Sequence, residues 1–372
     1  MKIAMLGHKR MPSREGGVEI VVEELSTRLV ALGHEVTVYS RRGHNVAGAS
    51  YDAQELTEYQ GVRIKTVPTI EARGLAALSS SFFATIAALR DKPDVIHFHA
   101  EGPCAMIPLA KLAGVRSVAT IHGLDWQRAK WGRFATSYLK HGERVAATKA
   151  DELIVLSKNT QDYFRETYGR ETNYIPNGVT VNDPVPAEAI ASAYGLAAES
   201  YVLFCGRIVP EKGIHYLIEA WRGLETDKTL VIAGGSSDSR DYFDRVKELA
   251  GDNPQIVFTD FVQGRVLQEL FSNACLYVLP SDLEGMPISL LEAMSYGRCC
   301  LTSDIPECAE VLGETGVTFR RSSVEALRDA LQGLLANDRL RHEYGAKARA
   351  RVVNDFGWDS VVERTLELYR QN

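Results

Sequence analysis

Two glutamates in one short segment form the strongest pattern for ligand chemistry in this sequence. Glu284 and Glu292 begin and end the run EGMPISLLE, and Pro287 suits the first turn of a helix, where its missing N–H costs little. Glu284 is then expected in the loop before that helix, and Glu292 about a turn and a half inside it. Two such carboxylates can bind two hydroxyl-bearing parts of one ligand, while amides at the helix start attract its negative charge. The alternative is an acid that stabilises the helix start beside an unrelated surface glutamate.

Two cations lie in the segment GRIVPEKG, between a predicted strand and a predicted helix. Arg207 and Lys212 can bind one diphosphate from two sides, because arginine offers a planar fork of donors and lysine a point charge. A solvated loop is the alternative. The position at the carboxyl end of a strand, where open parallel sheets bind ligands, favours the diphosphate site.

A glycine pair follows the first predicted strand. Gly16 and Gly17 end the loop HKRMPSREGG at the start of a helix, without the GxGxxG spacing of a dinucleotide site. Exposed amides at a helix start suit a phosphate, whereas a tight turn that requires glycine is the alternative.

His122 ends a predicted strand and precedes Gly123, so it is expected at the carboxyl edge of the first sheet and is interpreted as functional. His97 and His99 flank Phe98 in another predicted strand and are interpreted as structural. No group of histidines, cysteines or carboxylates has the spacing of metal ligands, and we expect no metal.

The segment 126–149 holds six Lys or Arg against one glutamate, a local charge of +5. At about 100° per residue, Arg133, Lys140 and Arg144 share one side of a helix. The opposite side, expected to face the core, holds Phe134, Tyr138, Leu139, Val145 and Ala146. With Trp126 beside it, the basic side predicts either a solvated face or a site for anionic lipid headgroups.

The elements that position these residues alternate between short β-rich runs and helical patterns, which predicts parallel sheets with helices on both faces. In the first half, strands are expected at residues 3–7, 35–40, 62–67, 94–99, 117–122 and 152–157. In the second half, they are expected at 201–207, 229–235, 255–261, 276–280, 299–303 and 316–319. Two such sheets facing each other would form a cleft between domains.

The segment 173–186 interrupts this alternation with three prolines and an Asn-Gly turn, and is the best linker candidate. We therefore predict one domain over residues 1–182 and a second over residues 183–355. A break at Phe356 and Gly357 precedes a last amphipathic helix, which makes residues 356–372 a separate segment.

Composition fits this organisation, since 372 residues suit two domains and 45% hydrophobic with 24% charged residues is typical of a soluble protein. No signal peptide, membrane span or paired-cysteine motif is evident, and we expect a cytoplasmic protein with reduced cysteines. Up to Val185 there are 23 Lys and Arg against 20 Asp and Glu, and from Pro186 on 19 against 28. The charges of +3 and −9 favour an anionic partner for the first half, although unrelated surface variation is the alternative.

Taken together, these segments resemble the retaining family 4 glycosyltransferases of the GT-B fold, from Met1 to about Tyr369. The resemblance is carried by the Gly16-Gly17 loop and by the segments TIHG, IPNGV, GR with KG, and EGMPISLLE. More narrowly, GVE with EEL, and HGLDWQR, resemble bacterial rhamnosyl- and galactosyltransferase-like enzymes of surface polysaccharide assembly.

The resemblance implies a GT-B fold of two Rossmann-like domains, the first binding the acceptor and the second the nucleotide sugar. The last helix then crosses back to the first domain. No cofactor or metal is implied, because the nucleotide sugar, UDP- or dTDP-linked, is a co-substrate. The acceptor is a glycan or lipid-linked sugar, no nucleic acid is expected, and contact with an anionic membrane surface is one further expectation.

The resemblance also assigns roles to single residues. It implies that Arg207 and Lys212 bind the donor diphosphate together with the amides of Gly16 and Gly17. Glu292 is expected to bind the ribose. Glu284 is expected to bind the transferred sugar, and His122 to contact it as well. The other expected donor contacts are Gly285, the backbone of Met286 and Ile288 (since Pro287 lacks an N–H), and Gly235 and Val262 near the base; Asp125 and Trp126 are expected to bind the acceptor.

Three other classes stay open. A sugar-nucleotide epimerase would use the same ligand without an acceptor, but no acid–base carboxylates can be assigned to it. A non-catalytic two-lobed sugar-binding protein would normally be exported, and a dinucleotide oxidoreductase would need the missing glycine spacing.

Overall fold

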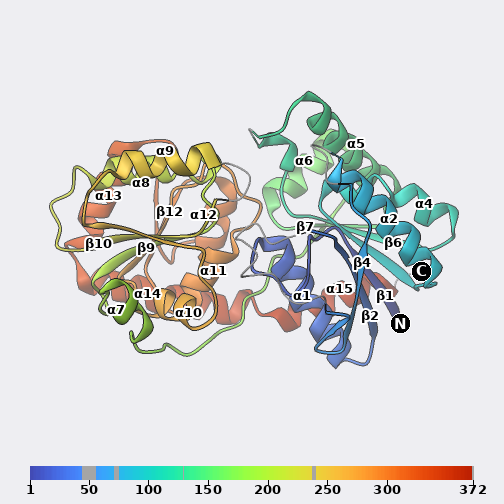
Figure 1. The fold of residues 1–372 in the computed structure, drawn as a ribbon, viewed down its shortest axis with the longest axis horizontal. Coiled ribbons are helices and arrows are strands. Elements are labelled where there is room, and N and C mark those ends of the chain that lie inside the picture. The colour runs from blue at the N-terminus through green and yellow to red at the C-terminus, as the bar shows by residue number, and fades with distance from the viewer. Residues whose placement is uncertain (44–55, 71–74, 129, 237–239, 371–372) are drawn as a thin grey trace. The chain divides into compact units, whose positions relative to one another are not determined.

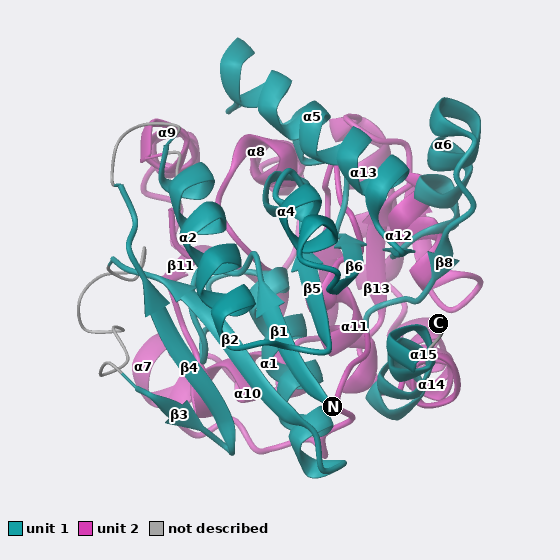
Figure 2. Ribbon diagram, turned by 90° about the vertical axis from the view of Figure 1, so that its right-hand side faces the viewer, with its two compact units in different colours: residues 1–177, 358–372 teal, residues 178–357 magenta. Residues whose placement is uncertain are grey.

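The computed structural model describes residues 1–43, 56–70, 75–128, 130–236 and 240–370. The chain forms two compact units (Figures 1 and 2). Unit 1 comprises Met1–Asn177 with Trp358–Asn372, and unit 2 comprises Gly178–Gly357. The two units meet at 177/178 and 357/358 along the chain, whereas the boundaries predicted from the sequence were 182/183 and 355/356. Unit 2 is thus an insertion between the two chain segments that make up unit 1.

The sheet of unit 1 has the strand order β3-β4-β2-β1-β5-β6-β7-β8. Its pairings are parallel except for the antiparallel pair of β3 and β4. Every residue of β5 is buried, as expected for a central strand covered on both faces. The strands are β1 (Lys2–Leu6), β2 (Glu35–Arg41), β3 (Glu58–Tyr59), β4 (Val62–Val67), β5 (Val95–His99), β6 (Arg116–Ile121), β7 (Glu152–Val155) and β8 (Asn173–Tyr174).

Helices cover the sheet of unit 1, and the last one comes from the far end of the chain. Helix α15 packs against α1 and β6 within this unit. The guanidinium of Arg28 lies 5.6 Å from the ring centroid of Trp358. The helices are α1 (Gly17–Ala31), α2 (Ala76–Arg90), α3 (Glu101–Cys104), α4 (Ile107–Leu112), the short 3-10 helix η2 (Asp125–Gln127), α5 (Arg133–Lys149), α6 (Lys158–Tyr168) and α15 (Trp358–Arg370).

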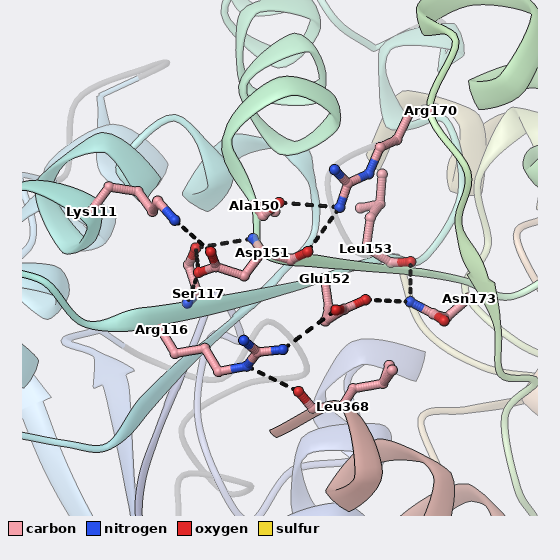
Figure 3. Close-up of polar contacts among 10 residues, drawn as sticks. All are labelled: Lys111, Arg116, Ser117, Ala150, Asp151, Glu152, Leu153, Arg170, Asn173 and Leu368. Carbon is pink, nitrogen blue, oxygen red and sulfur yellow. Dashed lines mark hydrogen bonds and ion pairs between the residues drawn. The ribbon is translucent and has the colours of Figure 1, made fainter. Parts of the chain in front are cut away.

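Polar contacts fasten the amino ends of β6 and β7 (Figure 3). Arg116 donates from Nε to the carbonyl of Leu368 in α15 at 3.0 Å. The carboxylate of Asp151 accepts hydrogen bonds from the amide and the hydroxyl of Ser117 at 2.8 and 2.9 Å, and also pairs with Lys111. These contacts occupy the amino edge of the sheet, which leaves its carboxyl edge for ligand chemistry.

The sheet of unit 2 is parallel throughout its described pairings, with the strand order β11-β10-β9-β12-β13-β14. In chain order this is 3-2-1-4-5-6, the doubly wound arrangement, whose direction reverses between β9 and β12. The strands are β9 (Tyr201–Cys205), β10 (Thr229–Ala233), β11 (Ile256–Asp260), β12 (Leu276–Leu279), β13 (Cys300–Ser303) and β14 (Val317–Phe319).

Helices lie on both faces of this second sheet. Figure 1 shows α8, α9 and α13 on one face and α7, α10, α11 and α14 on the other. The helices are α7 (Ala189–Tyr194), the 3-10 helix η3 (Pro210–Lys212), α8 (Ile214–Trp221), α9 (Arg240–Ala250), α10 (Gly264–Asn273), α11 (Ile288–Ser295), α12 (Pro306–Leu312), α13 (Val324–Leu335) and α14 (Asp338–Asp355). In the described parts of the chain, no helix has both the length and the apolar character needed to cross a bilayer.

Candidate active site

The reversal of strand order in unit 2 brings the predicted diphosphate and sugar residues together. The segment after β9 carries Arg207 and Lys212, and the segment after the neighbouring β12 carries Glu284. Nζ of Lys212 lies 2.5 Å from Oε1 of Glu284, and the two side chains are only 12% and 9% exposed. Ser281 donates its hydroxyl to the same oxygen at 2.6 Å. The two segments, 72 residues apart in sequence, therefore form one polar centre.

A glycine permits this close approach. Gly213 has φ +65°, and a Cβ at this position would lie 2.1 Å from the carbonyl oxygen of Pro280 at the end of β12. Only glycine fits both the left-handed backbone and the contact. Gly213 thereby fixes the position of Lys212, the residue before it, against the segment that carries Glu284.

The two cations of the centre differ in their partners. Lys212 is paired with Glu284, whereas the half-buried Arg207 makes no side-chain hydrogen bond or ion pair within the described residues. A lysine ammonium has three donors, so Lys212 can bind Glu284 and a phosphate oxygen together. Arg207 retains its planar set of donors for an anionic ligand.

The second glutamate lies on α11. This helix begins at Ile288, with Pro287 just before it as the N-cap rather than inside the first turn. Glu284 lies in the preceding loop and Glu292 on the helix, as the pattern predicted. Burial, followed by the charge of Glu292, raises the pKa of the Cys205 thiol, which places Glu292 near the carboxyl end of β9.

The other expected donor contacts lie on the same edge of this sheet. Gly235 follows β10, and its carbonyl accepts a hydrogen bond from the amide of Ile208 at 3.1 Å. Val262 follows β11 and is half-buried. Met286 and Ile288 are buried, at 7% and 8% exposure, so their side chains anchor the start of α11 while their backbone remains the expected contact.

In unit 1, β6 ends at Ile121, so His122, predicted as the last residue of this strand, is the first residue after it. Its Nε2 lies 3.0 Å from Nδ1 of His99. Burial lowers the pKa of His122 to about 4, although Asp125 and Glu19 oppose the shift. His122 is therefore a neutral imidazole near pH 7.

His8, the second residue after β1, also lies near a strand end and was not among the residues singled out from the sequence. It is buried, its Nε2 lies 3.2 Å from the hydroxyl of Ser40, and burial lowers its pKa to about 4. Its place directly after the predicted strand at residues 3–7 was the sequence signal that could have drawn attention to it.

The glycine pair begins α1, with Gly16 as the N-cap and Gly17 as the first helical residue. The carboxylate of Glu19 already lies at this helix start: its Oε2 is 2.7 Å from where a Cβ on Gly16 would be. Glu19 also accepts a hydrogen bond from the amide of Lys9 at 2.9 Å. A phosphate at these amides would share them with this carboxylate.

The expected acceptor residues lie in η2. Asp125 pairs with Arg128 at 2.9 Å. The indole N–H of Trp126 donates to Glu143 at 2.8 Å, and Nζ of Lys140 lies 4.2 Å from the Trp126 ring centroid. The Trp126 side chain is thus positioned by the carboxylate of Glu143 and the ammonium of Lys140.

Two buried glutamates support this region, and sequence reasoning missed both. Glu143 is 1% exposed and also accepts hydrogen bonds from the hydroxyls of Tyr163 and Tyr168, at 2.8 and 2.6 Å. Glu101 is fully buried, and burial, with the nearby carboxylates of Asp125 and Glu143, raises its pKa to about 10. Neither glutamate belongs to a local motif, so no sequence signal marked them.

The basic side chains Arg133, Lys140 and Arg144 are exposed on α5, as predicted. The prediction for Phe134 is wrong, because this side chain is 68% exposed instead of facing the core. The reason is the length of the helix: its buried positions begin only at Leu139, beyond the first turn. The described residues contain no group of three or more side chains suited to a metal ion.

Comparisons with known proteins agree with this arrangement. The family model described as "Glycosyltransferase Family 4" matches residues 15–183, and that described as "Glycosyl transferases group 1" matches residues 188–351. The two matches together account for most of both units.

Similar proteins extend over the whole chain. The alpha-maltose-1-phosphate synthase of Mycolicibacterium smegmatis is 27% identical over 100% of this chain and 99% of its own. A GDP-mannose-dependent alpha-(1-6)-phosphatidylinositol monomannoside mannosyltransferase of that organism is 27% identical, over 96% and 95%. The structure of Anabaena HepE in complex with UDP and glucose has a TM-score of 0.81 at 19% identity, over 99% and 98% of the chains, which shows a common fold.

Proposed function

Since the chain belongs to the family 4 glycosyltransferases of the GT-B fold, we propose that it transfers a hexosyl or deoxyhexosyl group from a nucleotide diphosphate sugar to an acceptor hydroxyl. The observation that carries the proposal is the charged centre at the strand reversal of unit 2. There, a guanidinium, a lysine paired with a glutamate, and a helix start lie on neighbouring strand ends. This combination suits a diphosphate joined to a polyhydroxylated ring.

In the proposed complex, Arg207 and Lys212 bind the diphosphate, aided by the amides of Gly16 and Gly17. Glu292 binds the ribose, and Glu284 binds hydroxyls of the transferred sugar. The base lies beside Gly235 and Val262, the backbone from Gly285 to Ile288 contacts the sugar, His122 contacts it near the reacting carbon, and Asp125 and Trp126 bind the acceptor.

The proposed reaction is a front-face transfer with retained configuration and without a metal. As the bond from the anomeric carbon to the diphosphate lengthens, negative charge grows on the leaving phosphate. Arg207 and Lys212 stabilise that charge. The acceptor hydroxyl attacks the oxocarbenium-like ring from the side of the leaving group, and the departing phosphate accepts its proton. The sugar donor proposed first is dTDP-rhamnose, ahead of UDP-hexoses, and the acceptor is a glycan or lipid-linked sugar of surface polysaccharide.

Incubation of the purified protein with UDP- and dTDP-sugars tests the activity. With a lipid-linked sugar acceptor present, we expect a glycosylated acceptor of retained anomeric configuration and release of nucleoside diphosphate, unchanged by a chelator. Epimerised donor without transfer, or binding without turnover, would contradict the proposal.

Substitution of the charged pair tests the site. Lys212→Ala and Glu284→Ala are each expected to lower turnover about 100- to 1,000-fold, because each removes a preorganised charge. Lys347→Ala and Glu343→Ala are the matched controls: this pair, 2.8 Å apart in the same unit, is more than half exposed. The controls are expected to keep near-normal turnover. A Lys212 or Glu284 variant that keeps more than a tenth of wild-type turnover removes the assigned role.

We further propose that α5 brings the enzyme to an anionic membrane surface on the cytoplasmic side. Arg133 and Arg144 are exposed on this helix, and the exposed aromatic ring of Phe134 lies beside Arg133 in sequence. A basic helix with an exposed apolar group is typical of interfacial binding. Such contact would bring a lipid-linked acceptor to unit 1.

A further inference from the structure

Two buried histidines, His97 and His99, and the half-buried His122 form a continuous contact at the carboxyl edge of the unit 1 sheet. His97 and His99 lie on the same face of β5, and their rings stack with centroids 4.1 Å apart. The ring of His122 lies 5.3 Å from that of His99, with their facing nitrogens 3.0 Å apart. His97 and His99 were expected to be structural, yet His99 contacts the proposed site residue His122 directly and His97 supports His99 from behind.

The far end of this contact is fixed by α15. Nδ1 of His97 lies 2.6 Å from the hydroxyl of Tyr369, and its Nε2 lies 2.7 Å from the hydroxyl of Thr120. With both nitrogens engaged, the His97 ring has one orientation. It offers His99 a fixed surface to stack on.

The protonation of these rings follows from their burial. Burial lowers the pKa of His97 to about 3 and that of His122 to about 4, and it holds the pKa of His99 well below its ordinary value. All three are neutral near pH 7. A hydrogen bond between two neutral imidazoles needs one protonated and one bare nitrogen, so either His99 or His122 is the donor.

The second nitrogen of His99 decides between the two arrangements. Nε2 of His99 is buried and has no hydrogen-bond partner in the described parts of the chain. If His122 were the donor, His99 would carry its proton on Nε2, and a buried N–H would have no acceptor. Such groups are rare and costly, more so than an unpaired acceptor. The favoured arrangement has the proton on Nδ1 of His99, which donates to Nε2 of His122.

We propose that His99 is a positioning residue that holds His122 in the tautomer protonated on Nδ1, so that His122 presents a hydrogen-bond donor to the transferred sugar. The role towards the sugar rests on the proposed function, whereas the tautomer does not. A neutral imidazole N–H can stabilise negative charge that develops on a sugar oxygen. It does so without placing a full positive charge beside the sugar ring.

Imidazole nitrogen NMR tests the tautomer without any assay of activity. We expect the wild-type protein to show His122 protonated on Nδ1. His99→Phe keeps an aromatic ring stacked on His97 but removes the N–H that donates to His122. In this variant His122 is expected to populate both tautomers, protonated on Nδ1 and on Nε2. His99→Asn places an amide N–H close to the former Nδ1 and is expected to keep the wild-type tautomer. Thermal unfolding establishes that each variant is folded.

Steady-state kinetics provide the second readout. Loss of an orienting partner of this kind is expected to lower kcat about 10-fold in His99→Phe, with little change in KM for the donor, and His99→Asn is expected to restore it. Wild-type His122 protonated on Nε2, or an unchanged tautomer in His99→Phe, overturns the proposal. Full activity of His122→Ala would instead refute the role of His122 in the proposed function, and the NMR result would still decide the tautomer.

Discussion

At the scale of single residues, the buried acid Glu101 makes unit 1 sensitive to pH. Its pKa, raised to about 10 by burial and neighbouring carboxylates, keeps it protonated in the folded protein. The unfolded chain releases that proton above its ordinary pKa near 4.5. Folding therefore binds a proton, and this group costs more stability as the pH rises through that interval.

Glu101→Gln removes this dependence while keeping the shape of the neutral acid. Relative to wild type, the free energy of unfolding of the variant is expected to rise by about 1 kcal/mol per pH unit between pH 5 and pH 8. Urea unfolding at both pH values measures the difference. Glu171→Gln, at an exposed side chain of the same unit, is the control. A Glu101→Gln effect of equal size at pH 5 and pH 8 would show that the acid is not held protonated.

At the scale of elements, the approach of α8 to the end of β12 determines the charged centre of unit 2. Gly213 permits this approach, because its Cβ position is 2.1 Å from a carbonyl oxygen. Gly195 has nearly the same backbone, with φ +68° against +65°, but open space around its Cβ position. The two glycines therefore separate backbone strain from steric contact.

Alanine at each glycine measures the two costs. Gly195→Ala is expected to lower the free energy of unfolding by about 1 kcal/mol, the cost of a left-handed residue. Gly213→Ala is expected to lose about 2 kcal/mol more, because the added methyl group must displace β12 or α8. It should also weaken UDP binding, measured by calorimetry, since Lys212 moves with α8. Equal losses of stability at the two positions would contradict this role for Gly213.

The sequence predicted those elements whose pattern lies within a few neighbouring residues, and it missed features that depend on very short strands or on contacts between distant residues. The glutamates of EGMPISLLE lie before and within α11 as predicted, because proline and helical spacing act over one or two turns. The two-residue strands β3 and β8 were not predicted, since two residues show no period. The contact of His97 with Tyr369 and the contacts of Glu143 with Trp126 and Tyr163 join separate segments of the chain, and no local sequence pattern reports such contacts.

At the scale of the whole molecule, the surface charge of α5 predicts binding to anionic membranes. Flotation with vesicles containing anionic lipid is expected to recover the wild-type protein and much less of a variant with Arg133, Lys140 and Arg144 changed to Gln. The control changes three exposed cations of unit 2, Arg320, Arg339 and Lys347, and so removes equal charge. Loss of binding in both variants would indicate general charge attraction, and unchanged binding of the α5 variant would exclude α5 as the contact.

The division of the chain also sets an order of events during synthesis. Residues 178–357 form unit 2 by themselves, but unit 1 needs α15, which the ribosome produces later. Until that helix emerges, His97 lacks Tyr369, and the indole of Trp358 has not reached Arg28. A nascent chain can thus contain a folded unit 2 while His97, His99 and His122 still lack the contact of His97 with Tyr369. These three histidines can reach their final geometry only after α15 has been synthesised.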